Sequence, residues 1–186
     1  MTTNSPTFKQ KLIFVFLVLV SIPLTLTGAL TLKARLSDGP SVIFSGGPLV
    51  SGEMVTGPEE PDWSFVRDIR TFELQLLNPA KSRTLWIVEN DGKLYLNSNY
   101  MSGIRQRFWK RWPEQAEKDG RAIMRIDGKR YERNLVRIKS GPIVEEVTKA
   151  FSDKYPVVMT TEEVEAEELW LFELAPRNET TAGESI

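Results

Sequence analysis

The sequence predicts an α+β domain, mainly antiparallel β, preceded by one long apolar helix. Two observations support this prediction. An uncharged run of 21 residues extends from Leu12 to Leu32, and two later Asp-Gly dipeptides each separate stretches of alternating apolar and polar residues. Alternation with period two is typical of half-buried strands, and Asp-Gly favours tight hairpin turns. The chain has 186 residues, 41% hydrophobic and 26% charged, which suits one packed domain.

Residues 12–32 predict a transmembrane anchor, because 21 residues at about 1.5 Å each cross the roughly 30 Å hydrocarbon layer. The alternative is a cleaved signal peptide, since Lys9 and Lys11 precede the run and Thr27-Gly28-Ala29 offers small residues for cleavage. We favour the anchor because of its length. The positive-inside rule then places residues 1–11 in the cytoplasm and the globular domain outside it. The expected partner of the anchor is the lipid bilayer.

Two less regular segments flank the predicted domain of residues 63–175. Residues 33–62 are rich in glycine and proline and predict a linker or loop. We favour a tether that lifts the domain off the bilayer, and a flap over a ligand site is the alternative. Residues 176–186 are polar and predict a flexible tail.

Within the domain, the sequence patterns that predict strands are clearer than those that predict helices. The expected strand segments are residues 71–76, a hairpin of residues 83–89 and 93–98 across Asp91-Gly92, a hairpin of residues 121–126 and 129–138 across Asp127-Gly128, and residues 169–174.

Two helices are expected between these strands. In residues 102–119, Ile104, Phe108, Trp112 and Ala116 are spaced four apart, which predicts a helix that Pro113 bends or divides. Residues 143–155 predict a second helix between two prolines.

The absence of Cys and His is the strongest chemical statement that the composition allows. It excludes disulfides, thiolate nucleophiles, Cys/His zinc sites and His-based acid–base catalysis, and no metal is expected. Any catalysis would need a bound cofactor, carboxylates, Lys, Tyr, Ser or Thr. The net charge of -1 provides no overall field that would attract nucleic acid, so no nucleic-acid partner is expected.

The order of hairpin, polar loop, Trp-bearing helix and second hairpin over Ser82 to Ile138 resembles the pyridoxamine-phosphate-oxidase-like flavoproteins, including their deazaflavin-dependent nitroreductase and quinone-reductase relatives. The resemblance implies a split β-barrel with a crossing helix and FMN or a deazaflavin as cofactor. It also implies oxidoreductase chemistry and a homodimer.

The segment after residue 97 leaves a strand, turns and enters the predicted helix, so its hydroxyls and arginines collect at a helix N-terminus, where anions bind. In the resembled family, this region holds the cofactor phosphate. The cofactor-binding residues predicted by this resemblance are Ser98, Asn99, Ser102, Arg105, Arg107, Trp109 and Lys110. The alternative is that Ser102 only caps the helix and the arginines lie in water. No catalytic residue is singled out.

Aromatic and basic side chains recur in two further places. We interpret Phe108 and Trp112 as core residues, while Trp109 with its basic neighbours could instead meet a membrane interface or a flavin ring. Strand alternation places Arg133 and Arg137 on one face. We interpret this face as solvated and paired with acidic residues, with ligand contact as the alternative.

Taken together, the sequence favours a membrane-anchored flavin- or deazaflavin-binding oxidoreductase-like protein. The alternative is a noncatalytic small-ligand-binding or envelope interaction module on the same scaffold.

Overall fold

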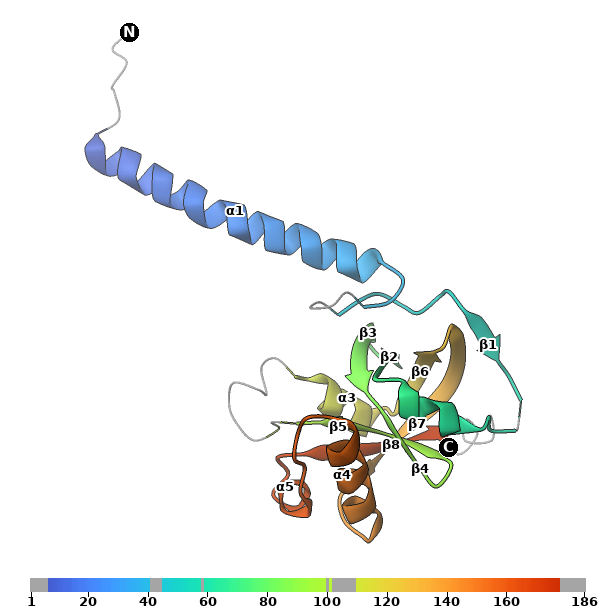
Figure 1. The fold of residues 1–186 in the computed structure, drawn as a ribbon. Helices are drawn as coiled ribbons and strands as arrows, with labels where there is room; N and C mark the ends of the chain where they lie inside the picture. The colour runs from blue at the N-terminus through green and yellow to red at the C-terminus, as the bar shows by residue number, and fades with distance from the viewer. Residues whose placement is uncertain (1–6, 41–44, 58, 100, 102–109, 178–186) are drawn as a thin grey trace, which may run out of the picture.

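A computed structural model describes residues 7–40, 45–57, 59–99, 101 and 110–177. The helices are α1 (Phe8–Leu36), the 3-10 helix η1 (Trp63–Asp68), α3 (Trp112–Lys118), α4 (Ile143–Lys154) and α5 (Thr161–Glu165). The strands are β1 (Glu53–Val55), β2 (Thr71–Leu77), β3 (Ala80–Trp86), β4 (Val88–Asn90), β5 (Lys93–Ser98), β6 (Arg121–Ile126), β7 (Lys129–Ile138) and β8 (Trp170–Pro176). Helix α1 projects away from the domain that the other elements form (Figure 1).

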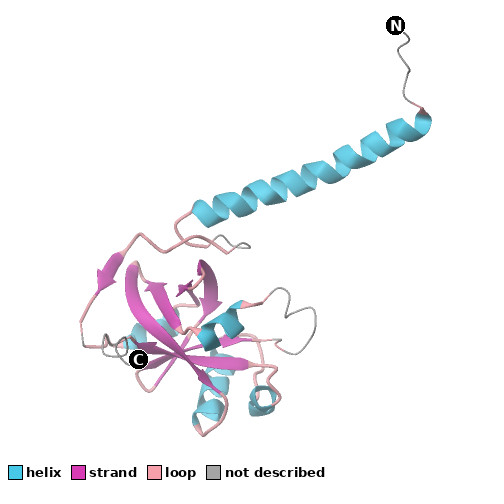
Figure 2. Ribbon diagram, turned by 180° about the vertical axis from the view of Figure 1, so that it is seen from behind, coloured by secondary structure: helices cyan, strands magenta, loops and turns pink. Residues whose placement is uncertain are grey.

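These strands form one curled sheet with helices packed on it, so the fold is the α+β split barrel that the sequence predicts (Figure 2). The order is β3-β2-β6-β7-β8-β5-β4 with antiparallel neighbours, and β1 pairs with β7 in parallel. Both predicted Asp-Gly turns are present. Asp91 and Asp127 have φ angles of 51° and 49°, and these turns close the β4–β5 and β6–β7 hairpins.

Residues 80–90 form a bent strand that contributes to both ends of this order. Its first part, β3, pairs with β2, and after Ile87 its second part, β4, pairs with β5. The prediction that residues 83–89 pair with residues 93–98 is therefore wrong for residues 83–86, whose partners lie in β2. An Asp-Gly turn fixes the pairing beside it and does not determine where a long strand changes partner.

Side chains at the end of α4 hold the backbone of the bend. Ile87 is fully buried and falls between the two ladders. Its N–H donates to Tyr155 Oη at 3.0 Å, and its carbonyl lies 2.8 Å from Lys154 Nζ and 2.9 Å from Tyr155 Oη. A buried peptide group left without a partner costs about 1–3 kcal/mol, so these contacts stabilise the change of partner.

Apolar clusters lie on both faces of the sheet. One fills the inside of the curl and the other lies beneath α4, and β5 shows the alternation because Leu94 and Leu96 belong to the inner cluster while Tyr95 packs under α4. The prediction that Trp112 is a core residue is confirmed, since it is 7% exposed in the inner cluster. Phe108 lies outside the described residues.

Helices α3 and α4 lie at expected positions, whereas η1 and α5 are not predicted from the sequence. Helix α4 confirms the helix predicted for residues 143–155, and α3 is the last part of the helix predicted for residues 102–119. Pro113 lies in the first turn of α3, where a missing N–H costs nothing. Residues 102–109 lie outside the described part of the chain.

Residues 45–52, which we call the strap, lie along the outer face of the sheet, although the sequence analysis assigns them to a linker. Gly46 and Ser82 exchange backbone hydrogen bonds of 3.0 and 3.2 Å, and the Leu49 N–H donates to Gln75 Oε1 at 2.7 Å. Leu49 is only 2% exposed, and the Arg130 guanidinium donates to its carbonyl. The strap is therefore part of the domain.

The strap also connects the domain to the end of α1. The Gly47 N–H lies 3.1 Å from the Ala34 carbonyl and 3.2 Å from the Ser37 carbonyl. A Cβ atom at Gly47 would lie 2.4 Å from the Arg35 carbonyl oxygen, so only glycine permits this approach. Asp38 accepts hydrogen bonds from two strap N–H groups. The domain thus begins within a few residues of the last turn of α1.

Helix α1 is long and apolar enough to span a membrane, with a mean hydropathy of 2.4 in its most apolar stretch. Its side chains are exposed except for Ala34, which contacts the strap, and Thr31, which is half-buried. The Thr27 and Thr31 hydroxyls donate to carbonyls one turn earlier, at 2.7 Å each. Hydroxyls satisfied within the helix suit an apolar environment.

Candidate functional site

Arg83 is a half-buried cation on the inner face of the curled sheet, and its Nε atom is buried. It pairs across β2 and β3 with Leu74, an inner-core residue, so both side chains are on the same face. Its guanidinium carbon lies 5.2 Å from the centre of the Trp112 ring. Within the described part of the chain, Arg83 Nε has no hydrogen-bond partner and no carboxylate pairs with the side chain. Burial lowers the pKa of Arg83 to about 10, so the group stays charged at neutral pH.

Three of the predicted cofactor-binding residues, Ser98, Asn99 and Lys110, lie in the described part of the chain. Lys110 comes two residues before Trp112, and its Nζ donates to the Asn99 carbonyl at 3.0 Å. Burial lowers the pKa of Lys110. Ser98 ends β5, is 3% exposed and pairs with Trp170. We call Arg83, Ser98, Asn99, Lys110 and Trp112 the basic cluster. The other predicted cofactor-binding residues, Ser102, Arg105, Arg107 and Trp109, lie outside the described residues.

A series of rings connects the members of the basic cluster through β8. The ring centres of Trp112 and Phe172 are 5.9 Å apart, and those of Phe172 and Trp170 are 6.4 Å apart. Trp112 and Phe172 lie at a tilt of 38°, which is a favourable arrangement for aromatic pairs. These contacts fix the ring on which Arg83 lies.

The preferred interpretation of Arg133 and Arg137 as a solvated face is wrong, whereas the expected pairing with acidic residues is confirmed. Both face the inside of the curl, and their side chains are only 2% and 7% exposed. Arg133 donates to Glu60 Oε1 at 2.7 Å and lies 5.1 Å from the Trp63 ring centre. Alternation correctly groups the two arginines on one face but cannot identify the side that is buried.

Arg137 is held in a similar way at the other end of β7. Its guanidinium lies 3.3 Å from the Trp170 ring centre and donates to Glu117 at 2.8 Å and Glu167 at 3.2 Å. Carboxylates and aromatic faces from distant segments thus replace water around both side chains. Arg133 and Arg137 already have anionic partners, whereas Arg83 has none among the described residues.

The geometry of the basic cluster suits an anion. A guanidinium binds phosphate or carboxylate oxygens with paired hydrogen bonds, and such charge-assisted bonds are about twice as strong as neutral ones. The partnerless Nε of Arg83 is an atom that a phosphate oxygen would satisfy, so Arg83 fits the phosphate of a cofactor. No group of three or more His, Cys, Asp or Glu side chains suited to a metal ion occurs among the described residues.

Sequence reasoning missed Arg83. The sequence pattern predicts that residue 83 pairs with the strand of residues 93–98, whereas it pairs with Leu74 of β2. The inward direction of its side chain therefore could not be recognised. One signal was available in the sequence. Residues 81, 83 and 85 lie on one face of the strand, and the apolar Leu85 indicates that this face is buried. A cation on an apolar face is unusual unless it is paired.

Comparison with known proteins gives a likeness of fold. No protein-family profile matches the chain, and no curated protein matches it. A solved structure of the conserved hypothetical protein Rv2991 from Mycobacterium tuberculosis is 17% identical with a TM-score of 0.44, covering 68% of this chain and 84% of that one. A candidate pyridoxamine 5'-phosphate oxidase from Listeria innocua is 8% identical with a TM-score of 0.40, covering 62% of this chain and 90% of that one.

The second of these structures bears the description of the family that residues 82–138 resemble. At these identities and TM-scores, neither structure assigns a ligand or an activity to this chain.

Proposed function

We propose that this protein is a membrane-anchored flavin- or deazaflavin-binding protein of the oxidoreductase type, and that the basic cluster holds the phosphate of the cofactor. One observation carries the proposal. Arg83 is half-buried, its buried Nε has no hydrogen-bond partner, and no carboxylate pairs with it within the described part of the chain. Isolated buried cations are costly, so a site that keeps one gains from an anionic ligand.

Three members of the basic cluster have distinct parts in this proposal. Arg83 would bind the phosphate with paired hydrogen bonds, Lys110 would add a second cation and the Ser98 hydroxyl would donate from the end of β5. Ser102, Arg105, Arg107 and Trp109 remain predicted contributors, together with Asn99. A bound flavin or deazaflavin would supply hydride or electron transfer, while the protein holds and orients it.

The membrane arrangement is also part of the proposal. Residues 12–32 of α1 would cross the bilayer, with residues 1–11 in the cytoplasm and the barrel on the other side. The length and apolar character of α1 support the anchor. A homodimer is expected from the family resemblance alone.

The direct test is a cofactor titration of the full-length protein in detergent. Any chromophore retained on purification is released by denaturation and identified from its absorption and mass, and FMN and a deazaflavin are then titrated separately. Loss of a charged hydrogen-bond partner from a buried site costs about 1.5–3 kcal/mol, so we expect Arg83→Gln to weaken cofactor binding about tenfold or more.

Arg121→Gln is the matched control. Arg121 lies at the start of β6, its side chain is 58% exposed and it already pairs with Asp119. We expect this variant to bind the cofactor as the unaltered protein does. Equal effects of the two substitutions, or no binding of either cofactor, would refute the proposal. Phosphate binding that depends on Arg83 without flavin binding would favour the noncatalytic small-ligand module.

A further inference from the structure

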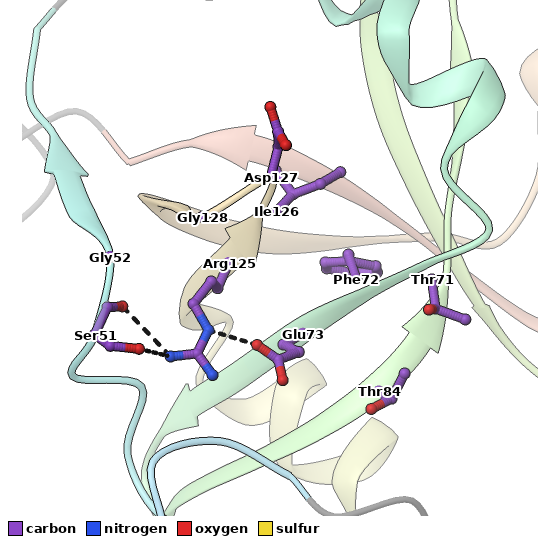
Figure 3. A pocket seen from close by; sticks show the side chains of 10 residues that line it. All are labelled: Ser51, Gly52, Thr71, Phe72, Glu73, Thr84, Arg125, Ile126, Asp127 and Gly128. Atoms are coloured by element: carbon purple, nitrogen blue, oxygen red, sulfur yellow. Dashed lines mark hydrogen bonds and ion pairs between the residues drawn. The ribbon is translucent and has the colours of Figure 1, made fainter.

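A cavity of about 450 Å³ opens between the strap and the outer face of the sheet. Figure 3 shows its walls, formed by the strap at Ser51, β2 from Thr71 to Glu73, β3 at Thr84 and the β6–β7 turn at Asp127. Glu73 and Thr84 pair with each other and point outward, whereas Arg83, the next residue, points into the curl. The cavity is therefore separate from the basic cluster.

Among the described residues that line this cavity, Arg125 is the only cation, and its guanidinium is already neutralised. It donates to Glu73 at 2.5 Å, to both Asp38 oxygens at 2.9 Å and to Ser51 Oγ at 2.7 Å. Asp38 and Glu73 both pair with this guanidinium, and Asp127 adds a third carboxylate to the cavity lining. Even with Arg130, whose guanidinium donates to the Gly52 carbonyl, these carboxylates outnumber the guanidinium groups by three to two.

Several acceptors in the cavity are still available. Arg125 engages Glu73 through Oε2, which leaves Oε1 without a hydrogen bond among the described residues. The hydroxyls of Thr71 and Thr84 likewise have no hydrogen bond within the described part of the chain. A ligand with a positive charge and several N–H donors would match this wall.

The cavity also lies close to the membrane if α1 spans it. The apolar run ends at Leu32, and the four further helical residues to Leu36 add about 6 Å. Asp38, which holds Arg125, follows two residues later and adds at most about 7 Å. The polar layer on each side of the hydrocarbon is about 5–8 Å thick. The cavity therefore lies within or just above the headgroup layer.

We infer that this cavity binds a primary ammonium group, carried by a lipid headgroup or by a free small amine. The excess of carboxylates favours a cation, and Glu73 Oε1 with the Thr71 and Thr84 hydroxyls, on one outer face of β2 and β3, suits the three N–H donors of an ammonium. Its volume lies in the range of small-ligand sites, about 300–1,000 Å³. The inference does not depend on cofactor binding by the basic cluster.

The test follows the backbone amide signals of Gly52 and Gly128 in the isotope-labelled full-length protein, since both glycines line the cavity. In nonionic detergent, ethanolamine is titrated against choline, which has the same charge but no N–H donors. We expect ethanolamine to shift both signals saturably and to bind about tenfold more tightly than choline. In nanodiscs, phosphatidylethanolamine is compared with phosphatidylcholine to test the lipid source.

Asp127→Asn and Asp91→Asn form a matched pair, because the two residues occupy equivalent positions in the two Asp-Gly turns. We expect Asp127→Asn to weaken ethanolamine binding about three- to tenfold and Asp91→Asn to leave it unchanged. Shifts with the free amine but not with the lipid would identify a soluble ligand, and shifts with the lipid would identify a headgroup. The inference is overturned if neither amine source shifts the signals, if choline binds equally well, or if both variants behave alike.

Discussion

Replacing Tyr155 by Phe tests the account of the bend at Ile87. The substitution removes one oxygen atom and keeps the ring, which stacks on Trp86 with centres 4.5 Å apart. The lost hydroxyl accepts the Ile87 N–H and lies within hydrogen-bond distance of the Ile87 and Arg70 carbonyls, at 2.9 and 2.6 Å. Its single hydrogen serves one carbonyl at a time.

The magnitude follows from what remains after the substitution. The Ile87 N–H stays fully buried and loses its partner, while the Ile87 carbonyl keeps Lys154 Nζ at 2.8 Å. A buried donor left unsatisfied costs about 1–3 kcal/mol. For a chain of this size, each kcal/mol lowers the melting temperature by about 2–4 °C. We therefore expect a decrease of about 2–12 °C.

The assay is thermal and denaturant unfolding of the full-length protein in detergent, followed by tryptophan fluorescence. Tyr95→Phe is the control, because Tyr95 is 1% exposed and its hydroxyl makes no hydrogen bond within the described part of the chain. We expect this control to change the unfolding free energy by less than about 0.5 kcal/mol. Equal effects of Tyr155→Phe and Tyr95→Phe would show that the hydroxyl does not support the bend.

Three further predictions concern ionisable side chains. Burial would raise the pKa of Asp38, but hydrogen bonds from Ser51, Val50 and Arg125 outweigh it and lower the pKa. Asp38→Asn should therefore destabilise the protein by about 1 kcal/mol at neutral pH in melting experiments, and the difference should shrink as the pH falls below about 4. Glu60→Ala should lower the free energy of unfolding by about 2–4 kcal/mol in denaturant, because it leaves the buried Arg133 cation unpaired. Arg133→Met removes that cation and should lower the free energy of unfolding clearly less. The reverse order would contradict this account. Burial, with Arg70 nearby, lowers the pKa of Lys154 to about 8, so the folded chain binds fewer protons than the unfolded chain between pH 8 and about 10.4. The unfolding free energy should rise across that window, and Lys154→Met should abolish this contribution if the assignment is right.

The parts of the fold that could be predicted from the sequence are those that neighbouring residues determine. The turns at Asp91 and Asp127 need only a residue that tolerates positive φ followed by glycine. Helix α4 needs only its apolar spacing, which buries Val144, Val147 and Phe151. The sequence signals for these elements therefore lie within the elements themselves.

The missed features depend on partners far along the chain. The bend at Ile87 relies on Tyr155, 68 residues later, and the burial of Arg133 relies on Glu60, 73 residues earlier. The strap is held mainly through its backbone groups, and the Ser82 hydroxyl, for example, donates to the Gly47 carbonyl. Because backbone groups leave no mark in the sequence, the glycines of the strap cannot be told from those of a flexible spacer. Of the predicted cofactor-binding residues, Ser98, Asn99 and Lys110 lie in the described part of the chain, where Lys110 donates to the Asn99 carbonyl, and their role in binding stays a prediction.

The bent strand of residues 80–90 has a consequence for how the domain opens. Strands β2 and β5 lie near opposite ends of the sheet order and do not pair with each other, yet both pair with this one continuous segment. Detaching the segment from either strand disturbs the contacts on which the other relies. Amide hydrogens of β2 and β5 should therefore exchange with solvent in the same opening event, as one cooperative unit rather than as two independent halves.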